Sequence, residues 1–331
     1  MPLLLLSLLQ TSLLLAPRPS LAAVPWRQDE FFISFWVGPQ VPVGELDARI
    51  AEVAEANFTG FLGFNGTRAE GAYEPAHPAR VQAEVDACAR HGLRCVPSLC
   101  GVVPGRLPLD KSNRTCLSIG AGAAHFWGFQ LVDEPSPGDF SALAEWSEAI
   151  TAARPDALRF FNLLPSAELS MFPHLRDYEA YVSNFTRAVK PQVLSMDFYT
   201  TFGSGSGAGR CSPWPGMPPS APGSQCPERA QDANGDCRES KWMYSANLAV
   251  LRRQAEHAPG GPIPFWTFFN AMPFDSKHAD PTEAMIRWQA MTAVTWGASG
   301  VMYFCCECAH ACSGRSNSAC LPSSLINVCH A

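Results

Sequence analysis

Residues 125–135 read His-Phe-Trp-Gly-Phe-Gln-Leu-Val-Asp-Glu-Pro, an apolar run that stops in two adjacent carboxylates, Asp133 and Glu134, and a proline. A buried parallel strand has this apolar composition, and it cannot continue through a proline. Both acids are therefore expected where a strand opens into a loop. In a barrel of parallel strands that edge carries the chemistry. The alternative is that the two acids cap a helix beginning near Pro137, since acidic side chains favour helix N-termini.

The same alternation of short apolar runs and amphipathic stretches continues along the chain. Strands are expected at residues 31–37, 58–64, 93–99, 126–132, 158–164, 193–199, 263–269 and 300–304. Helices are expected at residues 45–56, 78–91, 139–153, 178–189, 241–257 and 282–296. This order predicts an α/β fold, a (β/α)8 TIM barrel over residues 23–304. A doubly wound sheet would need a glycine-rich phosphate loop, and residues 38–42, Gly-Pro-Gln-Val-Pro, do not form one.

The bulk composition and the N-terminal segment indicate a secreted protein with a large core. The chain has 331 residues, is 47% hydrophobic and has a net charge of −6, and no basic stripe indicates a nucleic-acid partner. Residues 3–15 are an apolar segment, and Ser20-Leu21-Ala22 supplies small residues of the kind that a signal peptidase reads. We expect residues 1–22 to be a cleaved secretory signal, with no membrane association afterwards. An uncleaved anchor is the alternative.

The cysteines and the glycosylation sequons agree with this compartment. Thirteen cysteines are scattered without paired CxxC sets, which favours disulfides over metal, and their odd number leaves at least one thiol unpaired. Four Asn-x-Thr sequons begin at Asn57, Asn65, Asn113 and Asn184. A secreted, disulfide-bonded glycoprotein is therefore expected.

A stretch at residues 201–240 is rich in glycine, proline and cysteine and has almost no periodicity. We expect a long loop stapled by disulfides, which would overhang the barrel mouth because it follows the sixth strand. Asp232, Asn234 and Asp236 alternate like the start of a calcium loop. However, Cys237 stands where glycine is expected and Met243 where the closing glutamate is expected. A solvated turn is the better interpretation.

The tail from Cys305 to Ala331 contains six cysteines and no amphipathic helix, so the last helix of the barrel is missing or replaced. A barrel without that helix exposes apolar sheet surface. The spacings of the tail match no zinc motif. Our hypothesis is that the true gene product diverges near residue 305, through a mispredicted exon or a frameshift, and comparison with the transcript tests it.

The residues that close the predicted strands form a ring of acids, amides and aromatics, which is what a sugar site needs. Amides and acids hydrogen-bond hydroxyls, and aromatic rings cover the apolar face of a pyranose. Each tryptophan alone is more often a core residue than a sugar platform. The predicted substrate-binding residues are Trp36, Asn65, Asn162, Tyr199, Trp266 and Asn270.

The chain resembles TIM-barrel glycoside hydrolases in three stretches. They are residues 128–135, Gly-Phe-Gln-Leu-Val-Asp-Glu-Pro, residues 195–199, Ser-Met-Asp-Phe-Tyr, and residues 264–270, Pro-Phe-Trp-Thr-Phe-Phe-Asn. In the large retaining group the fourth strand ends in Asn-Glu-Pro, with glutamate as acid/base, and the seventh ends in a nucleophilic glutamate. Glu134 matches the first glutamate, but Asp133 replaces the asparagine and Asn270 stands near the second position. The resemblance therefore leaves the usual pair of glutamates incomplete.

Two mechanisms are compatible with the residues present, and both use Glu134 as the general acid. In the first, Asp197 is the base or nucleophile, and the separation of the carboxylates decides between inversion and retention. In the second, similar to barrel hexosaminidases that use the acetamido group of the substrate, Asp133 orients the acetamide. The second mechanism needs no nucleophile on the seventh strand. Strand alternation is an objection to it, because neighbouring residues point to opposite faces.

We expect a secreted glycosidase that cleaves O-glycosidic bonds in oligo- or polysaccharide, with no cofactor and no metal. A metal-dependent hydrolase would need histidines at strand ends, and a serine hydrolase would need a nucleophile elbow, which residues 203–207 match only in letters. The alternative of another class is a barrel that binds glycan without hydrolysing it. The missing seventh-strand glutamate favours that alternative, and the Asp133-Glu134 pair opposes it.

Overall fold

The computed structural model describes residues 25–36, 38–39, 41–63, 67–69, 72–74, 77–100, 115–166, 171, 175–200, 239–272 and 281–304. Eight of its strands correspond to the eight predicted ones: β1 (Phe32–Phe35), β2 (Gly60–Leu62), β5 (Arg94–Val96), β6 (Gly128–Asp133), β7 (Leu158–Asn162), β8 (Leu194–Asp197), β9 (Phe265–Asn270) and β10 (Gly300–Phe304). The six predicted helices are also confirmed: α1 (Val43–Glu55), α2 (Pro78–His91), α4 (Phe140–Ala153), α5 (Leu175–Val189), α6 (Glu239–Glu256) and α7 (Glu283–Thr295). A short hairpin, β3 (Thr67–Ala69) and β4 (Ala72–Glu74), was not predicted.

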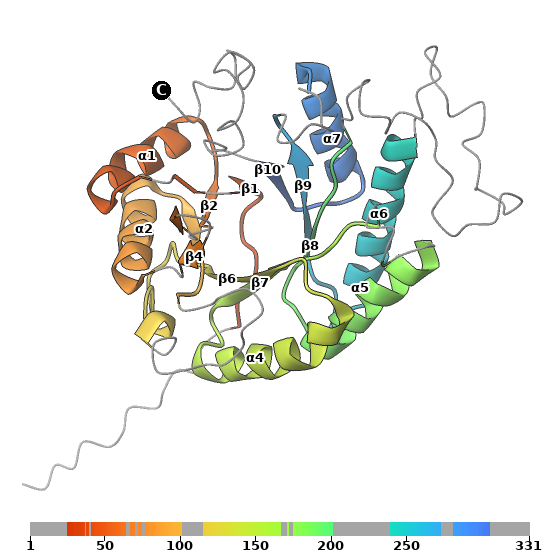
Figure 1. Cartoon of the computed structure of the whole chain (residues 1–331), viewed down its shortest axis with the longest axis horizontal. Coiled ribbons are helices and arrows are strands. Elements are labelled where there is room, and N and C mark those ends of the chain that lie inside the picture. The colour runs from red at the N-terminus through yellow and green to blue at the C-terminus, as the bar shows by residue number, and fades with distance from the viewer. Residues whose placement is uncertain are drawn as a thin grey trace, which may run out of the picture.

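The eight strands follow one another as in a barrel, and their ladders are parallel. One sheet has the order β1-β10-β9-β8, and two further pairs are β2-β5 and β6-β7. A parallel bridge between Cys95 and Phe126 joins β5 to the start of β6, and one between Leu163 and Met196 joins the end of β7 to β8. The helices lie outside these strands (Figure 1). The chain is therefore a (β/α)8 barrel.

The ring is not closed by a continuous ladder, because β1 and β2 contact each other through isolated hydrogen bonds. The N–H of Thr59 donates to the carbonyl oxygen of Ile33 at 3.1 Å, and the N–H of Leu62 donates to Ser34 Oγ at 3.0 Å. A buried serine hydroxyl thus substitutes for one rung of the ladder. Side-chain bonds of this kind satisfy backbone groups that would otherwise be buried without a partner.

Aromatic side chains fill the amino-terminal half of the barrel interior. The ring of Trp266 stacks on Phe32 at 4.4 Å, on Phe160 at 5.4 Å and on Trp127 at 6.1 Å, and Trp26 meets it edge-on at 6.5 Å. We call these five residues the aromatic layer. Stacked and edge-on pairs of this kind add to the stabilisation that burial provides. Because aromatic side chains occupy this end of the interior, polar side chains are concentrated at the carboxyl ends of the strands.

Two glycines make room for the aromatic layer. A Cβ atom on Gly60 would lie 2.0 Å from Cε2 of Phe32, and one on Gly300 would lie 2.6 Å from Cδ1 of Trp266. Any larger side chain would displace a ring of the layer. Glycine is therefore required at these positions by close approach and not by backbone conformation.

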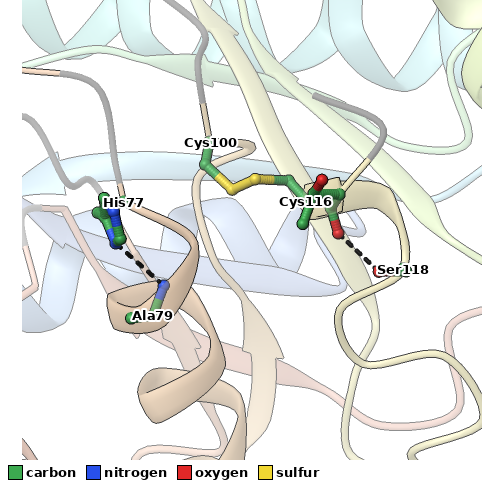
Figure 2. Close-up of a disulfide and its surroundings, with 6 residues drawn as sticks. His77, Ala79, Cys100, Cys116 and Ser118 are labelled. Atoms are coloured by element: carbon green, nitrogen blue, oxygen red, sulfur yellow. Dashed lines mark hydrogen bonds between the residues drawn. A yellow bond between two sulfur atoms is a disulfide. The ribbon is translucent and has the colours of Figure 1, made fainter. Parts of the chain in front are cut away.

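A disulfide joins Cys100, just after β5, to Cys116, which precedes β6, with the two Cα atoms 5.8 Å apart (Figure 2). Nearby, His77 caps α2, since its Nδ1 accepts a hydrogen bond from the N–H of Ala79 at 3.3 Å. The disulfide agrees with the expected oxidising compartment. Cys88 and Cys95 are buried free thiols.

Several predictions from the sequence lie outside the described residues. These are the signal at residues 1–22, the sequons at Asn65 and Asn113, almost all of the loop at 201–240 and the tail at 305–331. Of the described sequons, Asn57 and Asn184 are both exposed. Among the helices that the structure describes, none has the length and apolar composition to cross a membrane.

Candidate active site

The backbone of Glu134 is strained where β6 ends. The strand closes at Asp133, and Glu134 follows with a φ of 48°, in the left-handed region. For a residue other than glycine this conformation costs roughly 1–2 kcal/mol. The N–H of Glu134 donates to the carbonyl oxygen of Asn162 at 2.8 Å, which holds the turn against the end of β7. Strain of this kind is concentrated at functional sites.

This turn answers the objection from strand alternation. The register of β6 against β7 is irregular between Gln130 and Val132, and the left-handed Glu134 ends the extended backbone. Asp133 and Glu134 are both exposed. Asp133 Oδ1 accepts a hydrogen bond from Asn162, and the carboxyl group of Glu134 is hydrogen-bonded to that of Asp197. Both neighbouring acids therefore reach the same rim of the barrel.

The two acids are not the caps of the following helix. Ser136 is the N-cap of the 3-10 turn η1 (Pro137–Asp139), which leads into α4. Its N–H and its hydroxyl donate to Asp139 Oδ2 at 2.9 and 2.7 Å, which forms a capping box. Since Ser136 and Asp139 supply the cap, the capping interpretation of Asp133 and Glu134 is wrong.

Asn162, the last residue of β7, connects two of the carboxylates. Its Nδ2 donates to Asp133 Oδ1 at 3.1 Å and to Asp197 Oδ1 at 2.8 Å. Its Oδ1 accepts a hydrogen bond from Ser195 Oγ at 3.0 Å. Both N–H groups of the amide are thus occupied by protein partners, and Asn162 is 3% exposed. Asn162 lies between two of the predicted acids and hydrogen-bonds to both. Its N–H groups are therefore not free to bind a sugar, as the prediction required.

Burial and mutual repulsion raise the pKa of two of these acids. Asp197 is 7% exposed, and its burial followed by the charge of Asp133 raises its pKa to about 7, against the lowering effect of the Asn162 hydrogen bond. Asp133 contacts solvent, but the atoms of the barrel rim around its carboxyl group, followed by the charge of Glu134, raise its pKa to about 7 as well. Of the two acids, Asp197 is the more deeply buried, so burial accounts more directly for the raised pKa of Asp197. Near neutral pH each of these two acids is therefore partly protonated.

Tyr199 lies beside this group. It is hydrogen-bonded to Asp197, and burial followed by the nearby carboxylates, Asp197 foremost, holds its pKa well above the usual value. It therefore remains a neutral hydroxyl. Its ring lies 4.8 Å from that of Phe304 at the end of β10. Tyr199 thus offers an oxygen and an aromatic face at the rim.

Three of the other predicted site residues are buried, and the fourth lies outside the described residues. Trp36 is 7% exposed and packs edge-on against Phe268 at 5.3 Å. Trp266 is 0% exposed in the aromatic layer, and its Nε1 donates to Gln28 Oε1 at 3.0 Å, so no face of its ring is open to a sugar. Asn270, at the end of β9, is fully buried. Asn65 lies outside the described residues.

The sequence analysis did not single out two residues that hold the site together. Ser195 is the hydroxyl donor to Asn162, and the hydroxyl of Tyr181, on α5, donates to the carbonyl oxygen of Pro135 at 2.7 Å. Strand alternation offered a signal for Ser195, since residues 195 and 197 of one strand face the same side. No local pattern pointed to Tyr181, because its partner is 46 residues away in sequence.

Asp133, Glu134 and Asp197, called here the carboxyl cluster, have the means to donate a proton and to stabilise positive charge. Among the described residues, no group of three or more histidine, cysteine, aspartate or glutamate side chains has the arrangement of a metal site. Charge and hydrogen bonding in the cluster come from carboxyl, amide and phenol groups. Such groups are able to serve acid–base chemistry.

Comparisons with known proteins support the fold. No protein-family model matches the chain, and no curated protein matches its sequence. A candidate α-L-fucosidase from Bacteroides thetaiotaomicron is similar in structure, with a TM-score of 0.52 and 9% identity over 86% of this chain and 90% of that one. An endo-1,4-β-mannanase from Rhizomucor miehei has a TM-score of 0.49 and 7% identity over 92% and 95% of the two chains.

A third solved structure is also similar at low identity. The homocysteine methyltransferase MmuM from Escherichia coli is similar with a TM-score of 0.45 and 12% identity over 84% of this chain and 92% of that one. Identities this low show the fold alone, and barrels with one fold carry unrelated activities. The comparisons confirm the (β/α)8 barrel, and any functional conclusion depends on the carboxyl cluster.

Proposed function

We propose that the protein is a secreted glycoside hydrolase in which Glu134 is the general acid. The observation that carries the proposal is the convergence of Asp133, Glu134 and Asp197 at one rim of the barrel, through Asn162 and the strained turn at Glu134. Glu134 is exposed, as an acid that protonates a leaving oxygen must be. The substrate is an oligo- or polysaccharide, and no cofactor takes part.

Of the two mechanisms, we propose the substrate-assisted one. Asp197 is almost completely buried and already accepts a hydrogen bond from Asn162, which makes it a poor nucleophile toward an anomeric carbon. Asp133 is exposed beside Glu134, where it can orient an acetamido group while Glu134 protonates the leaving oxygen. As the bond from the anomeric carbon to the protonated leaving oxygen breaks, the acetamido oxygen attacks that carbon in place of a protein nucleophile. Water then attacks the same carbon, gives up its proton to Glu134 and reopens the ring formed with the acetamide. The substrate of this mechanism is an N-acetylhexosaminide.

The first experiment is hydrolysis of a panel of aryl glycosides, N-acetylhexosaminides included, by the protein and its Glu134→Gln variant. Removing a general acid should lower the rate by roughly 10²–10⁴-fold on substrates with poor leaving groups, and by less on activated aryl glycosides. Glu145→Gln is the matched control, since Glu145 is an exposed residue of α4. Equal loss in both variants, or an unaffected Glu134→Gln variant, would contradict the assignment.

The mechanism has its own test. A trifluoroacetamido group is a poorer nucleophile than an acetamido group, so the corresponding substrate should react more slowly if the acetamide takes part. Equal rates on the two substrates, or turnover only of hexosides that lack the group, would point to Asp197 as base or nucleophile instead.

A glycan-binding protein without activity is the second candidate. The observation in its favour is that β9 ends in Asn270, where the large retaining group has a catalytic glutamate. Well-folded protein that binds glycan on an array, and hydrolyses none of the panel, would favour this candidate.

A further inference from the structure

Ser195 and Asp197 lie two residues apart on β8, so they share the face that points into the barrel. Ser195 is 0% exposed, and its Oγ lies 3.0 Å from Asn162 Oδ1. Asn162 in turn donates to Asp133 and to Asp197. One buried hydroxyl, one amide and two carboxylates therefore form a continuous chain of hydrogen bonds that spans β6, β7 and β8.

The direction of the Asn162 amide decides whether this chain of bonds works. An asparagine amide has a donor end and an acceptor end, and a half turn about its last bond exchanges them. With Nδ2 toward the acids, both carboxylates accept a hydrogen bond. If Oδ1 points toward the acids, both hydrogen bonds from the amide are lost and the negative end of the amide dipole faces two acids. The ionised carboxylates, which can only accept, select the first orientation. At the opposite end the Ser195 hydroxyl, which can donate or accept, donates to Oδ1 and so polarises the amide toward the acids.

The preference matters most when the acids hold a proton. An ionised pair attracts the N–H end strongly, whereas a protonated carboxyl group can donate to Oδ1 and would then accept the reversed amide. The groups that face Asp197 are Asp133 and Glu134 from β6 and its exit, Tyr199 beyond β8, and Tyr178 and Tyr181 from α5. Among the described residues, no basic side chain contributes to the pKa of either aspartate. The Asn162 amide is a neutral group that hydrogen-bonds to both aspartates, and it lowers the pKa of each against the raising effect of burial.

We infer that Ser195 is a positioning residue: by donating to Oδ1 of Asn162, its hydroxyl strengthens the bonds from the amide N–H groups to Asp133 and Asp197 and so holds the two acids around Glu134. The catalytic consequence rests on the glycosidase proposal, but the positioning itself does not. The Ser195 hydroxyl donates to Asn162 and not to either acid, so it acts on the acids through that amide.

The test is a carboxyl-carbon NMR titration of Asp133 and Asp197 in the full chain. In Ser195→Ala the amide loses its donor and its bonds to the acids weaken, so the pKa of both aspartates should rise. The expected rise is roughly half a unit, because a hydrogen bond to a charged group is worth about one unit and here it is weakened and not removed. Ser195→Cys keeps a weaker donor of similar size and should fall between wild type and Ser195→Ala.

Ser34→Ala is the matched control. Ser34 is also 0% exposed, and its Oγ also makes a buried hydrogen bond, but to the N–H of Leu62 on the far side of the barrel. The Ser34→Ala variant should be less stable than wild type, but the pKa values of Asp133 and Asp197 should not change. If Ser195→Ala titrates like wild type, the proposal is overturned. If Ser195→Ala does not fold, Ser195→Cys decides the question in the same way, and a wild-type titration of that variant overturns the proposal.

Activity provides the second readout. If the protein is a glycosidase, the limb of its pH–rate profile that reports the aspartates moves upward in Ser195→Ala together with the NMR values. If wild type hydrolyses nothing but the NMR shift is observed, the function proposal fails and the positioning role stands. If activity depends on Glu134 but the titrations do not change, the positioning role fails and the function stands.

Discussion

The backbone N–H of Glu134 donates to the carbonyl oxygen of Asn162 at 2.8 Å. The same asparagine that binds Asp133 and Asp197 through its side chain thus holds the proposed general acid through its main chain. A distortion at the end of β7 would move all three acids together. This explains how a residue with a φ of 48° is kept in one conformation at an exposed loop.

Replacing Asp197 with asparagine should stabilise the protein at alkaline pH. Burial raises the pKa of Asp197 from 3.8 to about 7 in the folded chain. Relative to the unfolded chain, the group therefore favours folding below pH 3.8, and this contribution is lost as the pH rises through about 7. Asp197→Asn is neutral throughout, so its melting temperature should exceed that of wild type at pH 8, and the gap should close toward pH 4. The gap should be of the order of a few °C.

Asp133→Asn is the comparison for this measurement. The two acids share a raised pKa, but Asp133 is exposed and water relaxes the cost of its charge, so its gap at pH 8 should be smaller. Differential scanning calorimetry across this pH range provides the values. A gap for Asp197→Asn that is absent at pH 8, or that widens toward acid, would show that the buried acid is not the cause.

Removing the hydroxyl of Tyr181 should impair activity more than stability. That hydroxyl donates to the carbonyl oxygen of Pro135, directly after Glu134, at 2.7 Å. Without it the turn gains freedom, and displacement of a catalytic group by a fraction of an ångström lowers kcat, here by about tenfold. Tyr244→Phe is the control, because its buried hydroxyl donates to the carbonyl oxygen of Gln289 at 3.2 Å, between α6 and α7. Equal kcat values in the two variants would show that the Tyr181 hydroxyl does not support the site.

Removing the disulfide should lower the free energy of unfolding. Cys100 and Cys116 are 16 residues apart. Closing a loop of this length lowers the entropy of the unfolded chain, which stabilises the folded protein by about 3 kcal/mol. The double variant Cys100→Ser, Cys116→Ser should therefore unfold at lower urea concentration with a similar slope. Wild type in a reducing agent should match it, whereas the variant should not respond to reduction. An unchanged midpoint in both would mean that the bond does not constrain the chain.

Adding one methyl group at Gly60 should destabilise the barrel. Its Cβ would lie 2.0 Å from the Phe32 ring, which is fully buried and stacks on Trp127 and on Trp266. Overpacking of this kind costs about 1–3 kcal/mol. Gly44→Ala on α1 meets nothing within 4 Å and should be neutral or slightly stabilising. Urea unfolding of both variants measures the difference, and equal midpoints would contradict the packing described for the aromatic layer.

The strands and helices were predictable because each is specified by local composition. The apolar run before Asp133 became β6, and Leu46, Ile50 and Val53 became the buried face of α1. Their periodicity depends only on strand and helix geometry, which neighbouring residues determine. The β3–β4 hairpin was missed, since six residues in two short strands are too few for a periodic signal.

The roles of individual site residues were harder to predict from the sequence than the strands and helices were. Trp266 was predicted to bind sugar, and the structure buries it fully in the aromatic layer. Its neighbours Phe32, Trp127 and Phe160 come from three other parts of the chain, so the sequence around residue 266 does not report its burial. Asn162 was correctly predicted at the rim, but its engagement with two carboxylates was not foreseen.

The sequence by itself determined the order of the elements and placed Asp133, Glu134, Asn162 and Asp197 at the carboxyl ends of strands, because apolar runs and prolines specify where strands begin and end. Only the tertiary structure decided which of these groups meet. The bonds from Asn162 to Asp133 and to Asp197 join residues 29 and 35 positions apart. Their lengths depend on how neighbouring strands are shifted against one another around the barrel. That shift is set by packing of the whole interior, which no local stretch of sequence contains.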